Sequence, residues 1–286
     1  MVPLTHAPSE FAGRVLVAKL GSAVTVVEAE QRILPQYDEE LARPVARRLK
    51  ALGVKTLTSA KARGLSAKAD ALLVESATEE IRLHADKILL AVGRRPVLDG
   101  WGREELALDM NGKFIQIDDR CRTSMRGIYA IGDVTGEPML AHRAMAQGEM
   151  VAEIVAGHRR SWDKRCIPAV CFTDPEIVAA GLSPEQARQS GAEVKIGQFP
   201  FSANGRARAM NETEGFVKIL ADAKTDRVLG AHIVGADAGT IIAELAMAIE
   251  FGASSEDIAR TCHAHPTLNE CVKEAALAVD GRPIHI

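Results

Sequence analysis

A short segment near the C-terminus combines residue types that move protons. It reads CHAHPTLNE, from Cys262 to Glu270, and places Glu270 five residues after His265. Histidine titrates near neutral pH, so a carboxylate that holds one ring nitrogen leaves the other able to take and return a proton. Pro266 restricts the residue before it, so we expect a bend between two helices. We interpret His265 and Glu270 as a candidate acid/base pair, with a solvated ion pair as the alternative.

The same segment contains groups that bind metals. Cys262, His263, His265 and Cys271 carry the thiols and imidazoles that zinc prefers, but their spacing matches no common structural zinc pattern. We therefore predict no metal site here.

Two further carboxylates each follow an apolar, strand-like run. TSMRGIYAIGDV (123–134) places Gly132 and Asp133 at its end, where a missing side chain lets a ligand approach and a carboxylate can accept from a sugar or ribityl hydroxyl. Glu28 follows the apolar run in AVTVVEAE (23–30), and an acid there would bind the adenosine ribose of a dinucleotide and repel a 2′-phosphate. An ordinary aspartate in a turn after a strand is the alternative for Asp133.

The glycine-rich turn that normally precedes such an acid is absent. Residues 1–21 read MVPLTHAPSEFAGRVLVAKLG, with one glycine before Gly21. Without that turn the backbone cannot wrap a pyrophosphate closely. We expect the sheet to lack its first strand as well.

The elements that must position these residues follow two patterns. In the first part of the chain, the apolar pattern predicts a strand, a helix and a second strand. The helix places Leu41, Val45, Leu49 and Leu52 on one face. Further strands are predicted at 70–76 and 79–92, and the last of them is apolar enough to be buried on both faces. Next come strands at 114–119 and 127–133, a helix over 141–157 and a polar linker at 158–165. Beyond Pro168 we predict a hairpin of 216–222 with 227–235 and three helices: about 238–251, one capped by Ser254 with Asp257, and one from near Thr267. The fold class is α/β, with an α+β C-terminal domain.

Composition excludes several classes of partner. The 286 residues carry a formal charge of −3 and no polybasic block, which argues against nucleic acid and anionic membranes. The apolar runs are far shorter than the ~20 residues of a membrane span, and the N-terminus has no signal pattern. Five cysteines, an odd number, argue against a secreted disulfide framework, so we expect a cytoplasmic protein.

Seven motifs in one order make the combination specific, and the chain from about Val15 onward resembles the pyridine nucleotide-disulfide oxidoreductases. Within that family it is most similar to the flavoproteins that oxidise dihydrolipoamide with NAD⁺ for 2-oxoacid dehydrogenase complexes. The motifs are VTVVEAEQRILPQYD, ILLAVGRRP, TSMRGIYAIGDVTGEPMLAHRAMAQG, CFTDPEIVAAGLS, GFVKILAD, LGAHIVGADA and HAHPTLNE.

The resemblance implies an organisation and a set of cofactors. Residues 1–96 would be a truncated, Rossmann-like NAD-binding domain, 97–165 the returning segment of the FAD-binding domain, and 166–286 a dimerisation domain. FAD and NAD would be the cofactors. The partners would be a second copy of the chain and the lipoyl domains or other components of 2-oxoacid dehydrogenase complexes.

The resemblance also implies roles for single residues. Asp133 would bind the ribityl chain of FAD, with Met139, Leu140, Ala141 and His142 against the flavin. Glu28 would hold the NAD ribose, and Gly93 would lie in the last turn of that domain. His265, oriented by Glu270, would remove the proton of a substrate thiol across a two-fold interface.

Several departures from the family pattern limit the activity and the FAD binding that we expect of this chain. The family's redox disulfide and FAD pyrophosphate fingerprint lie in an N-terminal domain that this chain would lack. THAPSE (5–10) replaces the NAD glycine fingerprint, and Ala12 replaces a glutamate near the nicotinamide. We expect Cys166 and Cys171 of CIPAVC to be ordinary thiols, because an extended stretch holds them beyond the ~7 Å that a bridge spans.

Those departures lead to an expectation and two alternatives. We expect the chain alone to be inactive and to hold FAD weakly or not at all. The alternatives are a non-catalytic dimerising remnant and a glutathione reductase-like NADP enzyme, which the acidic Glu28 disfavours.

Overall fold

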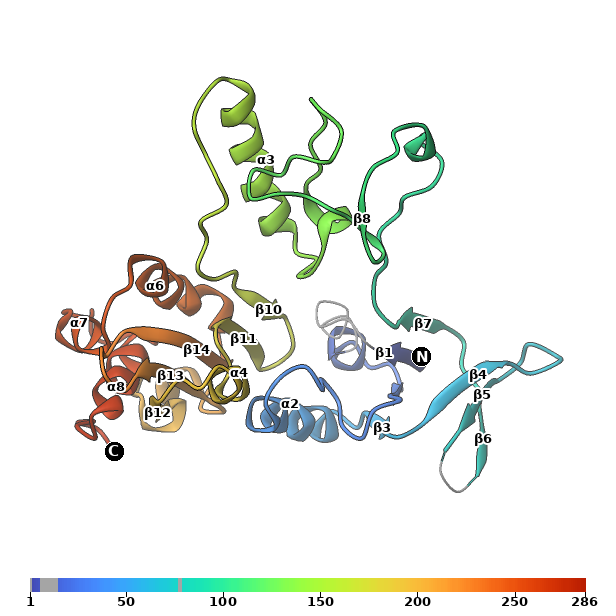
Figure 1. The fold of residues 1–286 in the computed structure, drawn as a ribbon. Helices are drawn as coiled ribbons and strands as arrows, with labels where there is room; N and C mark the ends of the chain where they lie inside the picture. The colour runs from blue at the N-terminus through green and yellow to red at the C-terminus, as the bar shows by residue number, and fades with distance from the viewer. Residues whose placement is uncertain (1, 6–14, 77–78) are drawn as a thin grey trace. The chain divides into compact units, whose positions relative to one another are not determined.

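The computed structural model describes residues 2–5, 15–76 and 79–286 (Figure 1). They form two compact units. The first unit combines residues 1–92 with 168–286, and the second unit comprises residues 93–167.

The first unit begins with a small parallel sheet in the order β3-β2-β1-β7. Its strands are β1 (Val2–Thr5), β2 (Thr25–Val27), β3 (Lys55–Leu57) and β7 (Ile88–Ala91). The expectation that the sheet lacks its first strand is wrong, because the backbone of β1 pairs in parallel with both β2 and β7. The four residues of β1 show no apolar alternation, and Pro3 lacks a backbone N–H, so no strand was predicted there.

Strand β7 also departs from expectation. The run ILLAV predicted a strand buried on both faces, yet Ile88, Leu89 and Leu90 are exposed, Leu90 to 66%. A strand is buried on both faces only where other elements cover each face, and the exposure of these three side chains shows that the described residues do not cover β7 in this way. The predicted segment 79–92 also divides, because β6 (Glu80–Leu83) joins a separate antiparallel sheet with β4 (Lys61–Leu65) and β5 (Leu72–Glu75).

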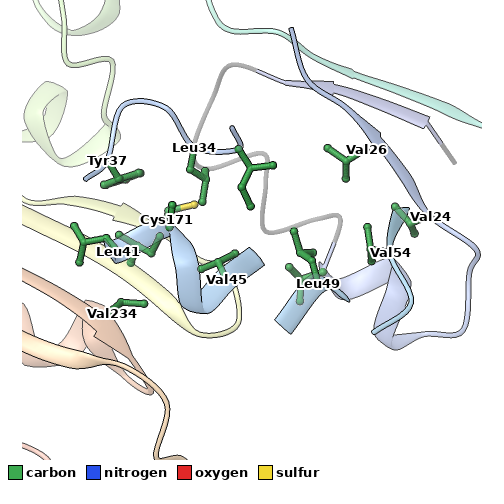
Figure 2. Packing of buried hydrophobic residues seen from close by; sticks show 14 of the residues in the cluster. Val24, Val26, Leu34, Tyr37, Leu41, Val45, Leu49, Val54, Cys171 and Val234 are labelled. Atoms are coloured by element: carbon green, nitrogen blue, oxygen red, sulfur yellow. The ribbon is translucent and has the colours of Figure 1, made fainter. Parts of the chain in front are cut away.

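Helix α2 (Glu39–Ala51) connects the two halves of the first unit. Its predicted apolar face is confirmed, with Leu41, Val45 and Leu49 buried. They belong to one core cluster with residues of the C-terminal sheet, among them Cys171 and Val234 (Figure 2). Since a fully buried Leu or Val contributes roughly 1.5–3 kcal/mol, this shared core holds α2 against the sheet.

The C-terminal part of the first unit is a five-stranded antiparallel sheet in the order β10-β11-β14-β13-β12. The predicted hairpin is confirmed as β13 (Phe216–Asp222) and β14 (Val228–Gly235). The other strands are β10 (Ala169–Cys171), β11 (Glu176–Gly181) and β12 (Val194–Pro200), and the short helices α4 (Pro184–Gln189), η3 (Phe201–Ala203) and α5 (Gly205–Met210) connect them.

Three helices complete this domain. Helix α6 (Ala238–Phe251) has the predicted bounds, and α7 (Ser255–Arg260) begins with the predicted capping box of Ser254 and Asp257. Helix α8 (Glu270–Val279) begins three residues later than predicted. The α/β class with an α+β C-terminal domain is confirmed.

The second unit has little regular structure besides α3 (Ala141–Val155). It also contains η1 (Arg103–Glu105), the two-residue strands β8 (Met110–Asn111) and β9 (Phe114–Ile115), and η2 (Gly132–Thr135). The predicted strand over 127–133 is wrong, and of the predicted strand over 114–119 only β9 forms. Residues 127–131 make an isolated bridge, Arg122 to Tyr129, because no described strand lies alongside to continue the ladder. Within the described residues, no helix is both long and apolar enough to span a membrane.

Candidate functional site

The CHAHPTLNE segment forms the bend expected between two helices. Helix α7 ends at Arg260 and α8 begins at Glu270, so His265 lies in the connection. The Nδ1 atom of His265 is 2.9 Å from Oε1 of Glu270. The side chain of His265 is 78% exposed, whereas that of Glu270 is largely covered. The structure thus brings the two predicted residues together, with the imidazole facing solvent.

Hydrogen bonds within the bend hold Glu270 and the chain around it. The second carboxylate oxygen of Glu270 accepts the backbone N–H of Thr267 at 2.9 Å. The Thr267 hydroxyl donates to the Ala264 carbonyl at 2.7 Å, and the Asn204 amide donates to the Thr267 carbonyl at 3.1 Å. Both oxygens of Glu270 are therefore committed within the bend.

The surroundings of Glu270 favour its charged form. Burial by itself would raise the pKa of the carboxyl, but the Thr267 N–H, the His265 ring and the charge of His285 outweigh it, and the pKa lies below its ordinary value. An ionised carboxylate at neutral pH can orient one nitrogen of His265 and stabilise the ring when it takes a proton.

The cysteines near this bend have different surroundings. Cys271 is fully buried, and burial together with the charges of Glu270 and Glu274 raises the pKa of its thiol to about 12. Cys262 is exposed. A thiol that stays protonated deep in the core is poorly suited to bind zinc, which needs the thiolate.

Asp133 lies in η2 and its side chain is exposed. Gly132 before it has a φ of +72°, and a Cβ at this position would lie 3.0 Å from the Cβ of Ala144 on α3. Both the backbone conformation and the close approach of α3 therefore require glycine. The aspartate is presented at a tight turn that leaves its carboxylate accessible.

Two side chains of α3 hold this turn, and the sequence interpretation missed both. The Gln147 side chain accepts the backbone N–H of Gly132 at 2.7 Å. The buried guanidinium of Arg143 donates to the Gly136 carbonyl at 2.8 Å, the Thr135 hydroxyl at 3.0 Å and the Gly132 carbonyl at 3.3 Å. Polar residues spaced i, i+4 on the helix face that also carries Met150 and Ile154 are the signal that could have identified them.

The predicted flavin-contacting stretch lies at the start of the same helix. Met139 is buried and Leu140 half-buried, whereas Ala141 and His142 are exposed. The Arg94 guanidinium donates to the Met139 carbonyl at 3.1 Å. Leu140 is the N-cap residue, and its side chain has no oxygen that could accept the first N–H groups of α3. Asp133 and residues 139–142 therefore share one scaffold in the second unit.

Glu28 follows β2 as predicted, but it is only 1% exposed. Its carboxylate accepts the backbone N–H of Glu30 at 3.0 Å and so lies within the turn. Gly93, after β7, has a φ of +116°. The replacements in THAPSE and at Ala12 fall, apart from Thr5, among residues 6–14, which lie outside the described residues.

Cys166 and Cys171 are not joined in the structure, which holds both as thiols. Cys171 is the last residue of β10 and is buried in the core against α2 (Figure 2). Cys171 therefore belongs to the hydrophobic core that joins β10 to α2, and we interpret it as a packing residue.

Comparison with protein families gives two matches that together span most of the chain. The model described as pyridine nucleotide-disulphide oxidoreductase matches residues 9–148. The model described as the dimerisation domain of pyridine nucleotide-disulphide oxidoreductases matches residues 167–276.

Named relatives agree with these matches but are longer. A dihydrolipoyl dehydrogenase of Pseudomonas aeruginosa is 53% identical over 268 residues, which is 94% of this chain and 58% of the relative. One from Geobacillus stearothermophilus is 43% identical over 272 residues, again 94% of this chain and 58% of the relative. The chain thus spans less than two thirds of the length of these relatives.

Solved structures show the same fold. The crystal structure of LpdA from Mycobacterium tuberculosis matches with a TM-score of 0.86 at 26% identity, covering 96% of this chain and 60% of that one. The HOCl-induced flavoprotein disulfide reductase RclA of Escherichia coli matches with a TM-score of 0.85 at 28% identity, covering 98% of this chain and 64% of that one.

Proposed function

Because the chain belongs to the pyridine nucleotide-disulphide oxidoreductases, we propose that it is the C-terminal portion of a flavoprotein that oxidises dihydrolipoamide with NAD⁺. The observation that carries the proposal is the 2.9 Å contact between His265 and Glu270 in a domain matched by the family's dimerisation model. The names of the relatives supply the substrate.

The chemistry of the pair suits a dithiol substrate. A free thiol has a pKa of about 8.5 and is a weak nucleophile until its proton is removed. Glu270 holds Nδ1 of His265, which leaves Nε2 on an exposed ring to accept that proton. Glu270 stabilises the resulting imidazolium, and the thiolate can then attack a disulfide. The imidazolium later returns its proton.

The second unit suits a flavin. An exposed carboxylate at Asp133 can accept from ribityl hydroxyls, and the backbone N–H of Ala141, the first residue of α3, can donate to the carbonyl edge of the ring. Bound FAD would supply the two-electron carrier between the disulfide and NAD⁺. Arg143 and Gln147 would keep the turn in place for it.

Glu28 and Gly93 are the candidate residues for NAD. A carboxylate after the second strand of a parallel sheet is the ribose acceptor of dinucleotide folds and disfavours NADP. Glu28 is buried and its carboxylate accepts the Glu30 N–H. When a ribose hydroxyl binds, this hydrogen bond must therefore be broken or shared with the hydroxyl.

The remaining proposals concern organisation and partners. We assign residues 1–96 to the NAD-binding domain, 97–165 to the FAD-binding domain and 166–286 to the dimerisation domain, and the family match over 167–276 supports a homodimer. Lipoyl groups of 2-oxoacid dehydrogenase complexes are the proposed source of substrate. Five cysteines held as thiols suit the cytoplasm.

A chimera tests this function. Residues 1–14 are replaced by the whole part of the Pseudomonas aeruginosa relative that lies N-terminal to its counterpart of Val15, so that the relative supplies its own strand in place of β1. NADH formation from dihydrolipoamide and NAD⁺ is then followed. We expect turnover by the chimera and none by the 286-residue chain alone. A folded chimera that binds FAD but shows no turnover would favour a non-catalytic dimerising remnant.

A further inference from the structure

A third carboxylate, Glu244, lies behind the bend that carries His265. It belongs to α6, and each of its oxygens meets a different part of the bend. Oε1 lies 2.7 Å from Nε2 of His263, and Oε2 accepts the side-chain amide of Asn269 at 2.8 Å. These partners lie two residues before His265 and one residue before Glu270.

His263 is fixed on both sides of its ring. Besides the contact with Glu244, its Nδ1 lies 2.9 Å from the Thr261 carbonyl. Its side chain is buried, in contrast to the exposed ring of His265. The start of the bend is thereby attached to both α6 and the end of α7.

Asn269 occupies the N-cap position of α8 but does not cap it with its side chain. Asparagine is among the preferred N-cap residues because its side-chain oxygen can accept from the first turn of the helix. Here the amide group instead donates to Glu244. The start of α8, where Glu270 is the first residue, is thus attached to α6 through the same carboxylate.

We propose that Glu244 is a positioning residue for the His265–Glu270 pair, because it holds both ends of the bend that sets the separation of the two side chains. The ring of His265 is too exposed for packing to place it, so the backbone on either side must do so. The catalytic meaning of this role rests on the proposed function, but the geometric claim does not.

Titration of Glu270 in the full 286-residue chain, followed by ¹³C NMR of its side-chain carboxyl, tests the proposal. The Thr267 N–H and the His265 ring help to hold the pKa of Glu270 below its ordinary value against the opposing effect of burial. If Glu244→Ala releases the bend, the hydrogen bonds of Glu270 to the Thr267 N–H and the His265 ring weaken, and the pH midpoint of the Glu270 titration rises. Removal of a nearby negative charge alone would lower the midpoint. The sign of the shift therefore separates positioning from direct electrostatics.

A second variant and a control complete the design. Glu244→Gln keeps the volume and one accepting oxygen, so it should raise the midpoint less than Glu244→Ala, and it serves as the primary variant if Glu244→Ala does not fold. Glu212→Ala, an exposed acid just after α5, should leave the midpoint unchanged. A midpoint that falls or does not move in a folded Glu244 variant would overturn the proposal. Failure of dihydrolipoamide oxidation in the chimera would leave this result intact.

Discussion

The guanidinium of Arg143 on α3 donates a 2.8 Å hydrogen bond to the carbonyl of Gly136, across the turn that presents Asp133. The same buried group also reaches the Thr135 hydroxyl and the Gly132 carbonyl. A single side chain therefore satisfies several polar groups of this turn, which lies outside the strands that the structure describes.

Arg143→Ala should destabilise the second unit by about 2–4 kcal/mol, because it leaves those acceptors unsatisfied. Both tryptophans of the chain, Trp101 and Trp162, belong to that unit, so denaturant unfolding can be followed by their fluorescence. Met145→Ala, at an exposed position of the same helix, should change the stability by less than about 0.5 kcal/mol. Equal effects of the two changes would remove Arg143 from this role.

Lys218 on β13 is a buried cation whose side chain is 4% exposed and forms an ion pair with Glu40 of α2. Burial lowers its pKa from the ordinary 10.5, with the charge of Asp38 opposing. Lys218→Met should therefore be neutral or stabilising by up to about 2 kcal/mol at pH 7, because it removes a desolvated ammonium and leaves Glu40, whose side chain is 40% exposed, in contact with water.

The pH dependence of this change has a defined sign. Between the lowered pKa of folded Lys218 and 10.5, the unfolded chain binds more protons, so the wild type gains stability as pH rises. The advantage of Lys218→Met should shrink from pH 7 toward pH 10 in guanidinium unfolding followed by circular dichroism. Lys224→Met, at an exposed lysine, is the control. An advantage that grows with pH would contradict the assignment.

Met247 and Phe251 lie one turn apart on α6, and both are exposed, Phe251 to 80%. We expect the chain to be a dimer in light scattering at micromolar concentration, through residues after Pro168. The double variant Met247→Glu and Phe251→Glu should shift the mass measured by light scattering toward that of the monomer, since charges are costly in the buried centre of an interface. Leu65→Glu, at an exposed position of β4, should leave the dimer intact. A monomeric wild type would refute this prediction.

In the chimera, Glu28→Arg should lower the ratio of kcat/KM for NAD⁺ to that for NADP⁺. The change removes the ribose acceptor and replaces repulsion of a 2′-phosphate by attraction. Steady-state kinetics with each cofactor measure the ratio. An unchanged ratio would show that the buried Glu28 does not contact the ribose.

Local signals in the sequence were sufficient for much of the fold. Apolar periodicity located α2 and α6, the Ser254 capping box located α7, and the spacing of His265 and Glu270 predicted a pair that the structure joins. Each of these features depends on residues close together in the chain.

The features that were missed depend on distant partners. Strand β1 exists because β2 and β7 flank it, and the exposure of β7 reflects what lies around it rather than its own composition. Glu244 is separated from Asn269 by 25 residues, so no local pattern links them. Arg143 and Gln147 carried a local signal, a pair of polar residues on the apolar face of a helix, but their partners appear only when η2 packs against α3.

We propose that His265 removes a thiol proton and that Glu270 orients the imidazole for this task. Rapid mixing of the oxidised chimera with dihydrolipoamide, with the flavin absorbance recorded, measures that step before NAD⁺ takes part. His265→Gln should slow flavin reduction by roughly 10²- to 10⁴-fold, the usual contribution of a positioned acid/base, and Glu270→Gln should slow it less because the imidazole remains. Flavin reduction at the wild-type rate in His265→Gln would refute this role and leave the pair with a function only in the structure of the bend.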